Sequence, residues 1–287
     1  MNDRILKYGI SPTDISGFAA ALRDKERSAA TVCKYVHDVR AFAEWLGSEI
    51  PCHSAVLEYK RKLTENYAPA TVNSVIASLN CFFDYIGSYE LKLRSVRLQR
   101  PVFMSCEREL TRDEYECLIS AARDEGKTRL LAIMQAICST GIRISELRFI
   151  TVDAVRRGCA DVTCKGKRRQ VLLPRRLVVI LKKYMQSAGV TRGALFVTRG
   201  GKNVDRSNIW SEMKKLCRAA GVESTKVFPH NLRHLFARVF YEVHRDIVRL
   251  ADILGHSSVN TTRIYTMESS DEHRRRIDNL GLLPFTT

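Results

Sequence analysis

The sequence predicts a mainly α-helical protein with an N-terminal helical domain and a mixed, mostly α second domain that contains a small antiparallel β-sheet. Three observations predict this fold class. The chain has 287 residues, about twice the ordinary size of a domain. Apolar residues recur at helical spacing over most of its length. One stretch, residues 151–174, changes to a Val- and Thr-rich pattern with glycine turns, as a small sheet would require.

Four helices are expected in the first hundred residues, and two of them resemble each other. The segments SAATVCKYVHDVRAFAEWLG (28–47) and APATVNSVIASLNCFFDYIG (68–87) align at an offset of 40, each with a threonine near its start and a glycine at its end. Two copies are too few for a solenoid, and two unrelated amphipathic helices explain the match equally well. The expected helices cover residues 12–25, 29–46, 53–65 and 70–86.

A basic linker is expected over residues 94–108. The surrounding stretch SYELKLRSVRLQRPVFMSCER loses helical periodicity, is rich in Lys and Arg, and has Pro101 in its second half. This makes residues 1–93 the first domain and residues 109–287 the second.

The second domain is expected to open with a helix whose start carries a capping box formed by Thr111 and Glu114. The sheet follows over residues 151–174. Further helices are expected near 128–140, 175–188, 205–220, 230–242, 246–254, 258–266 and 269–279. The tail, residues 267–287, ends in apolar side chains too few to form a core: Leu280, Leu282, Leu283 and Phe285. We expect it to pack on a neighbouring copy of the chain, with folding back on its own domain as the alternative.

The formal net charge of +16 is unevenly distributed. The first hundred residues carry 14 basic and 11 acidic side chains, and the remainder carry 33 and 20. Between Asp161 and Asp205 there are eleven basic residues and no acidic one. An acid-free stretch of this length favours a polyanion as partner. Nucleic acid is preferred to an anionic membrane, because no basic amphipathic helix with an aromatic face occurs.

Other classes of protein are disfavoured by what the sequence lacks. No apolar run reaches the roughly 18 residues of a membrane span, and the N-terminus has no apolar segment typical of a secretory signal. The nine cysteines include no C-x-x-C pair. Reduced thiols in a cytoplasmic protein are therefore expected, and neither disulfides nor a zinc site.

The segment PHNLRHLFA places His230, Arg233 and His234 on one face of an expected helix. Such a cationic cluster is a plausible anion clamp. A zinc site is the alternative, since two histidines four residues apart occur in H-E-x-x-H motifs. It is disfavoured because Asn231 stands where the glutamate would be and Arg233 would repel a metal ion.

Three more segments carry residues of interest. TGIRISELRFI places Arg143 one helical turn before Glu146, which is able to orient it. CKGKRRQ places Lys165 at a hairpin turn, with Lys167 as a rival for the same role. LGHSSVNTTRIYT places His256 in a turn before a helix that carries Tyr265. Taken singly, each has an ordinary explanation: a surface ion pair, a solvated lysine, a packing tyrosine.

The order and spacing of these segments closely resemble the tyrosine recombinase (phage integrase) family, and within it the Xer-like and transposon-integrase subgroup. The resemblance rests on the arginine of TGIRISEL, the hairpin lysine, H-x-x-R-H, L-G-H and a tyrosine nine residues later. It covers essentially the whole chain and implies that the first domain is a helical core-binding (SAM-like) DNA-binding domain. Two departures occur: Cys164 stands where glycine is frequent, and Leu235 where threonine is frequent.

The resemblance implies that Tyr265 cleaves one DNA strand, giving a 3′-phosphotyrosine bond and a free 5′-hydroxyl. Physical chemistry suits the residue types. Arginine stays charged and binds phosphate oxygens through two donors, which fits Arg143 and Arg233. A phenol with an ordinary pKa of about 10 needs a base, for which His230 is placed, with His256 sharing the role or holding the phosphate. Lys165 would protonate the leaving oxygen.

No cofactor or metal ion is implied, because the sequence has neither a phosphate-binding G-x-x-x-x-G-K-[ST] loop nor a paired-carboxylate metal site. The implied partners are double-stranded DNA recombination sites, three further protomers in a tetrameric synapse, and a partner recombinase or directionality factor, in a bacterial nucleoid. A topoisomerase-like nicking and closing enzyme of type IB, or an inactive architectural DNA-binding protein, is the alternative. Integration, excision, resolution and inversion all stay open. The expected DNA contacts are Arg94, Arg97, Arg100, Lys167, Arg168 and Arg169.

Overall fold

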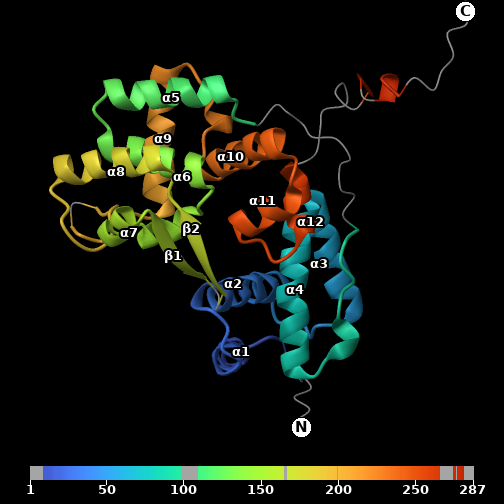
Figure 1. Ribbon diagram of the computed structural model, residues 1–287. Helices are drawn as coiled ribbons and strands as arrows, with labels where there is room; N and C mark the ends of the chain where they lie inside the picture. Colours follow the sequence, from blue (N-terminus) through green and yellow to red (C-terminus); the bar gives the residue numbers. More distant parts are fainter. Residues whose placement is uncertain are drawn as a thin grey trace, which may run out of the picture. The chain divides into compact units, whose positions relative to one another are not determined.

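The computed structural model describes residues 9–97, 109–164, 167–198, 200–265, 274–275 and 277–280. The chain divides into two units, Met1–Arg100 and Pro101–Thr287, each with its own apolar core (Figure 1). The dividing point falls within the segment expected to be a linker. Residues 98–108 of that segment lie outside the described residues, so the linker stays a prediction.

The first unit is all helical, and its expected helices are confirmed to within a residue or two. They are followed by a single 3-10 turn. Its core combines aliphatic side chains with a group of aromatic rings, in which Phe18, Phe42, Phe82 and Phe83 are almost fully buried and packed edge to face or tilted. The elements are α1 (Pro12–Asp24), α2 (Ala29–Leu46), α3 (His53–Asn66), α4 (Pro69–Ile86) and the 3-10 helix Tyr89–Leu91.

The two similar segments become two helices of equal length that pack against each other. α2 and α4 have 18 residues each, and they end at Gly47 and Gly87, both with a positive φ. A polar link crosses their interface, where the hydroxyl of Ser78 donates to the Asp38 carboxylate over 2.6 Å. The shared pattern therefore corresponds to a packed helix pair.

The second unit is mostly helical, with one two-stranded sheet. Its helices are α5 (Arg112–Asp124), α6 (Thr128–Thr140), α7 (Val152–Arg157), α8 (Arg175–Ala188), α9 (Arg206–Ala220), α10 (Pro229–His244), α11 (Ile247–Leu254) and α12 (Val259–Thr262). Short 3-10 helices span Ile144–Phe149, Ser224–Lys226 and Arg263–Tyr265. The capping box of Thr111 and Glu114 is confirmed at the start of α5.

The sheet is smaller than expected. β1 (Cys159–Cys164) and β2 (Lys167–Leu172) pair antiparallel, with Cys164 opposite Lys167. The expectation of a sheet from residue 151 onwards was wrong for its first part, because α7 occupies that part. The hydroxyl of Thr151 accepts a hydrogen bond from the amide of Ala154 and so caps this short helix. The β-branched valines of the helix had favoured the prediction of a strand.

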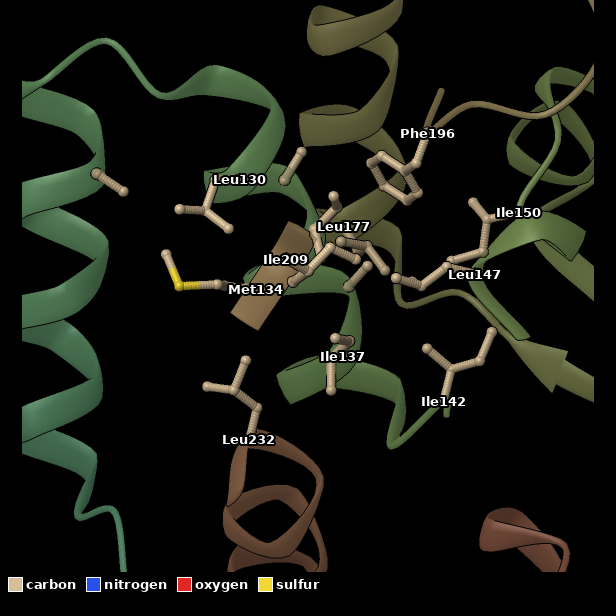
Figure 2. Close-up of a cluster of buried hydrophobic side chains, with 14 of the residues drawn as sticks. Leu130, Met134, Ile137, Ile142, Leu147, Ile150, Leu177, Phe196, Ile209 and Leu232 are labelled. Atoms are coloured by element: carbon tan, nitrogen blue, oxygen red, sulfur yellow. The ribbon is translucent and has the colours of Figure 1, made fainter. Parts of the chain in front are cut away.

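The core of the second unit surrounds α6. This helix contacts α5, α8, α9 and α10 (Figure 1), and its buried residues include Leu130, Ile133, Met134 and Ile137. Figure 2 shows Met134 and Ile137 of α6 among side chains from other elements, including Phe196, Ile209 and Leu232. A helix apolar on all sides is a central helix. α10, which carries part of the candidate site, is thus packed on this core.

The segment around Tyr265 differs from the single helix expected over residues 258–266. One α-helical turn, α12, is followed by the 3-10 helix Arg263–Tyr265. The helix expected near 269–279 falls mainly on residues outside the description. Within the described part of the chain, no helix has the length and apolar character that crossing a membrane requires.

Candidate active site

Arg143 is positioned by the end of α6. The helix ends at Gly141, whose φ of +64° lets the chain turn sharply. Arg143 then caps the 3-10 helix Ile144–Phe149, and its backbone amide donates to Glu146 Oε2 over 3.0 Å. Its Nη1 donates to Glu146 Oε1 over 3.0 Å and its Nη2 to the carbonyl of Gly255 over 3.3 Å. The expected orientation of Arg143 by Glu146 is therefore seen in the structure.

Glu146 is a buried carboxylate, with only 2% of its side chain exposed. Burial alone would raise its pKa, but the Arg143 amide and the guanidinium groups of Arg169 and Arg143 together lower the pKa below its ordinary value. Glu146 is therefore a permanent negative charge at neutral pH.

The start of α10 presents His230, Arg233 and His234. Pro229 stands at the first helical position, where its missing N–H costs nothing. Spacings of three and four residues place the three side chains on one face, as the sequence predicted. The rings of His230 and His234 meet edge to face with centroids 4.5 Å apart.

Arg233 is 2% exposed and is tied to backbone on both sides. One nitrogen donates to the carbonyl of Gly141, and Nη2 donates to the carbonyl of Leu254 over 2.8 Å. Nη2 also lies 3.0 Å from His256 Nε2. Burial, followed by the positive charge of Arg143, lowers the pKa of Arg233 to about 10, which leaves it charged at neutral pH.

His256 follows α11 directly. The helix ends at Gly255 with a φ of +63°, and the His256 amide donates back to the carbonyl of Ala251 over 2.9 Å. The ring then lies with Nδ1 2.9 Å from Thr262 Oγ1. Burial and the nearby charges of Arg233 and Arg143 lower the pKa of His256 to about 4.

Tyr265 closes the site from the 3-10 helix that follows α12. It is 4% exposed and packs with the buried residues of α10 and α11. Its ring lies edge to face with that of His234 at 4.9 Å and parallel to that of His256 at 6.2 Å. Burial raises its pKa, whereas the charge of Arg233 and a hydrogen bond with that guanidinium oppose the rise.

The two remaining histidines of the cluster are neutral at pH 7. Burial and the charge of Arg233 lower the pKa of His230, which leaves a ring able to accept a proton. Burial and the neighbouring His230 lower the pKa of His234 to about 4. The Tyr265 ring therefore lies against two neutral imidazoles, those of His234 and His256, and His256 is bonded to the buried guanidinium of Arg233. Guanidinium donors held in place in this way are suited to an anionic group such as a phosphate.

The predicted residues Arg143, His230, Arg233, His256 and Tyr265 are thus brought together from three segments, the outermost of which lie more than 100 residues apart in sequence. Lys165 lies between β1 and β2 and outside the described residues, and the side chain of its rival, Lys167, lies outside the description too. The lysine assignment stays a prediction.

The predicted DNA contacts divide into three groups. Arg94, Arg97 and Arg168 are exposed, as such contacts need to be. Arg100 and the side chain of Lys167 lie outside the described residues. Arg169 does not fit the prediction: its side chain is 16% exposed and is paired with Glu146 over 2.7 Å, so its guanidinium is turned to the protein.

Sequence reasoning underrated two members of the site. Thr262 is fully buried and holds His256, a role that the hydroxyl-rich segment SSVNTTRIY hinted at without singling it out. His234 was noted as part of the cluster but given no role, although its ring packs on Tyr265. Among the described residues, no three His, Cys, Asp or Glu side chains group as metal ligands would.

Comparisons with known proteins bear on this arrangement. Residues 108–272 match the model of the phage integrase family. The tyrosine recombinase XerA of Thermococcus kodakarensis is 31% identical over 278 residues, covering 94% of this chain and 95% of that protein. The tyrosine recombinase XerD of Proteus mirabilis is 29% identical, covering 83% of each.

Solved structures show the same fold. A crystal structure of a λ integrase dimer (residues 75–356) bound to a COC′ core site superposes with a TM-score of 0.73 at 16% identity, covering 90% of this chain and 95% of that one. The XerH site-specific recombinase bound to its difH substrate, in a pre-cleavage complex, superposes with a TM-score of 0.68 at 20% identity, covering 93% and 84%.

Proposed function

The chain belongs to the phage integrase family and is a tyrosine-type site-specific recombinase of DNA, and on this basis we propose that Tyr265 is its nucleophile. Five further side chains complete the active site in this proposal: Arg143, Lys165, His230, Arg233 and His256. The observation that supports it is the packing of the Tyr265 ring against the rings of His234 and His256, with His256 hydrogen-bonded to the buried Arg233.

We propose the following cleavage step for these residues. The Tyr265 oxygen forms a bond to the scissile phosphorus while the bond from phosphorus to the 5′-oxygen breaks. The phenol proton passes to neutral His230, and Lys165 gives a proton to the departing 5′-oxygen. The products are a 3′-phosphotyrosine and a free 5′-hydroxyl.

In this proposal, the two guanidinium groups stabilise the negative charge of the transition state. Arg143 and Arg233 meet the non-bridging oxygens, and neither needs to move far because each is already held by backbone carbonyls. Rejoining is the reverse: a 5′-hydroxyl from another duplex attacks phosphorus and the tyrosine oxygen departs with its proton restored. The energy of the cleaved phosphodiester bond is conserved in the phosphotyrosine bond, so rejoining requires no nucleotide hydrolysis.

The test of the nucleophile is covalent capture. A duplex sequence that the protein selects from a random pool is rebuilt as a nicked suicide substrate, from which the cleaved fragment diffuses away. We expect the wild-type chain to form a covalent protein–DNA adduct, Tyr265→Phe to form none, and Tyr241→Phe, a matched change on α10, to form as much as wild type. An adduct that persists in Tyr265→Phe would remove Tyr265 from this role.

Exchange of both strands at two sites requires four cleavages, and we propose a synapse of four protomers on two DNA sites. We propose that one protomer holds the next through the second unit. A mostly apolar pocket of about 350 Å³ lies between α5 and α10, lined by Tyr115, Phe236, Val239, Phe240 and Val243 among others. We assign to it, in the synapse, the apolar C-terminal segment 280–285 of a neighbouring copy.

The remaining assignments keep the sequence-based boundaries. We propose that residues 1–93 bind the core DNA site, that residues 94–108 link the domains, and that residues 109–287 carry catalysis and the tail, residues 267–287. Arg94, Arg97, Arg100, Lys167 and Arg168 are the proposed phosphate contacts. A partner recombinase or a directionality factor would act on this assembly. Recombination of plasmids carrying two selected sites, and not mere relaxation, is the expected product and separates this function from that of a topoisomerase.

A further inference from the structure

Arg169 is a charged side chain that the chemistry above does not use. It stands on β2, opposite Val162 of β1. One of its terminal nitrogens donates to the carbonyl of Ile253 in α11, and Nη2 donates to Glu146 Oε2 over 2.7 Å. With 16% of the side chain exposed, the guanidinium is bonded within the protein.

Glu146 joins Arg169 to Arg143. Its Oε1 accepts from Arg143 Nη1 and its Oε2 from Arg143's amide as well as from Arg169. One buried carboxylate is therefore shared by two guanidinium groups. The three side chains carry a net charge of +1, whereas Arg143 and Glu146 alone would carry none. Arg169 thus compensates Glu146 and leaves the charge of Arg143 available for a phosphate.

Gly255 is a second, independent observation at the same place. A Cβ on this residue would lie 2.5 Å from Arg169 Cδ and 2.6 Å from Nε, distances that side chains do not show. The turn between α11 and His256 is thus packed directly on Arg169. The carbonyl of Gly255 in turn accepts from Arg143 over 3.3 Å. Arg169 therefore contacts both the partner of Arg143 and the turn that aims His256.

We propose that Arg169 is a positioning residue for strand cleavage: by neutralising and holding Glu146, it keeps Arg143 charged and directed at the scissile phosphate. The proposal rests on the proposed function, since it assigns Arg169 to the same reaction. It replaces the expectation that Arg169 binds DNA directly. The effect is on the chemical step and not on affinity for DNA, because Arg169 meets no phosphate.

The test compares three full-length variants on the selected nicked duplex under single-turnover conditions. Arg169→Met removes the charge and keeps the length, and Arg169→Lys keeps the charge but cannot bond Ile253 and Glu146 together. Arg157→Met is the matched control, because Arg157 forms an exposed ion pair with Asp161 beside the same sheet.

We expect Arg169→Met to lower the cleavage rate constant at saturating DNA roughly 10- to 100-fold, as a displaced catalytic group does. The dissociation constant for DNA should stay within about threefold of wild type, Arg169→Lys should recover part of the rate, and Arg157→Met should match wild type in both quantities.

A second substrate distinguishes an electrostatic effect of Arg169 from a folding defect in Arg169→Met. Replacing one non-bridging oxygen of the scissile phosphate by methyl removes its negative charge, so the reaction depends less on Arg143. On this methylphosphonate, the gap between wild type and Arg169→Met should shrink to about threefold or less if the proposal is right. A gap of equal size on both substrates would mean a folding defect, and it would overturn the proposal.

Two other results would also overturn it. A wild-type cleavage rate constant in Arg169→Met would show that the ion pair between Arg169 and Glu146 does not contribute to cleavage. Weaker DNA binding with a reduced salt dependence and an unchanged rate constant would return Arg169 to the phosphate contacts. Absence of any adduct from the wild-type chain would instead contradict the proposed function, so the two failures are distinguishable.

Discussion

Arg233 Nη2 lies 3.0 Å from His256 Nε2, and the other ring nitrogen of His256 lies 2.9 Å from the hydroxyl oxygen of Thr262. Arginine has only donors, so Nε2 must accept and the ring must be neutral, with its proton on Nδ1 donated to Thr262. The buried arginine thereby fixes the tautomer of the histidine beside the proposed nucleophile.

This relationship predicts how stability depends on pH. The pKa of His256 is lowered to about 4 in the folded chain, against an ordinary value of 6.5. Between pH 4 and 6.5 the unfolded chain binds more protons, so the free energy of unfolding should rise with pH in that window. Urea titrations across the window should show a smaller rise in His256→Gln and an unchanged rise in His53→Gln, since His53 is exposed. Equal slopes in all three proteins would contradict the tautomer assignment.

Arg233→Lys should impair both folding and cleavage. A lysine offers one point of donation and cannot reach Gly141, Leu254 and His256 together, so a buried carbonyl loses its partner. We expect the free energy of unfolding to fall by about 1–3 kcal/mol and the cleavage rate constant to fall roughly 100- to 1000-fold. Urea denaturation and single-turnover cleavage measure the two effects. Arg157→Lys should change neither.

Gly141→Ala should be far more damaging than Gly158→Ala. Both glycines have a positive φ, +64° and +77°, which costs an alanine about 1–2 kcal/mol. Only at Gly141 would the new Cβ collide, at 2.5 Å from Phe236 Cδ1, whereas nothing lies within 4 Å at Gly158. Overpacking should add about 1–3 kcal/mol at Gly141. Similar unfolding free energies for the two variants would show that Phe236 moves aside freely.

Val243→Glu should weaken the synapse without affecting cleavage. Val243 is 69% exposed at the pocket between α5 and α10, so a charge there should be tolerated by the fold and should repel an apolar tail. We expect synapsis, followed by a two-duplex gel-shift assay, to need roughly tenfold more protein. Val179→Glu, an exposed position on α8 away from the pocket, is the control.

Removing residues 280–287 should reproduce the effect of Val243→Glu, and the combined variant should be no worse than either alone. Additive defects would mean that the tail and the pocket act separately. A tail deletion with normal synapsis would withdraw the assignment of the tail to the pocket.

Local signals made most of the fold predictable. The capping box at Thr111 and the glycines after α2, α4 and α6 set helix ends through contacts within one turn, which the sequence displays directly. α7 was missed because its two valines favour a strand and its cap, Thr151, has no acidic partner three residues on.

The residues of the candidate site could be predicted from the sequence, but the hydrogen bonds and ion pairs that join them could not. The order of Arg143, His230, Arg233, His256 and Tyr265 is visible in sequence, but their bonds join distant segments. Arg169 lies 23 residues from Glu146 and 84 from Ile253, and nothing in the run KRR distinguishes an arginine that pairs with a buried carboxylate from one that faces solvent. Such contacts exist only once the chain has folded.

Arg233 binds the carbonyls of Gly141 and Leu254, which makes a proposed catalytic residue also a structural brace between α6 and α11. This has a consequence for how the sequence can diverge. A descendant that abandoned catalysis could replace Tyr265 by Phe, which keeps the buried ring, or the exposed His230 at little cost to folding, whereas replacing Arg233 would loosen the domain itself. A divergent relative that retains this arginine therefore shows common ancestry and a stable fold. Retention of the tyrosine is what indicates activity.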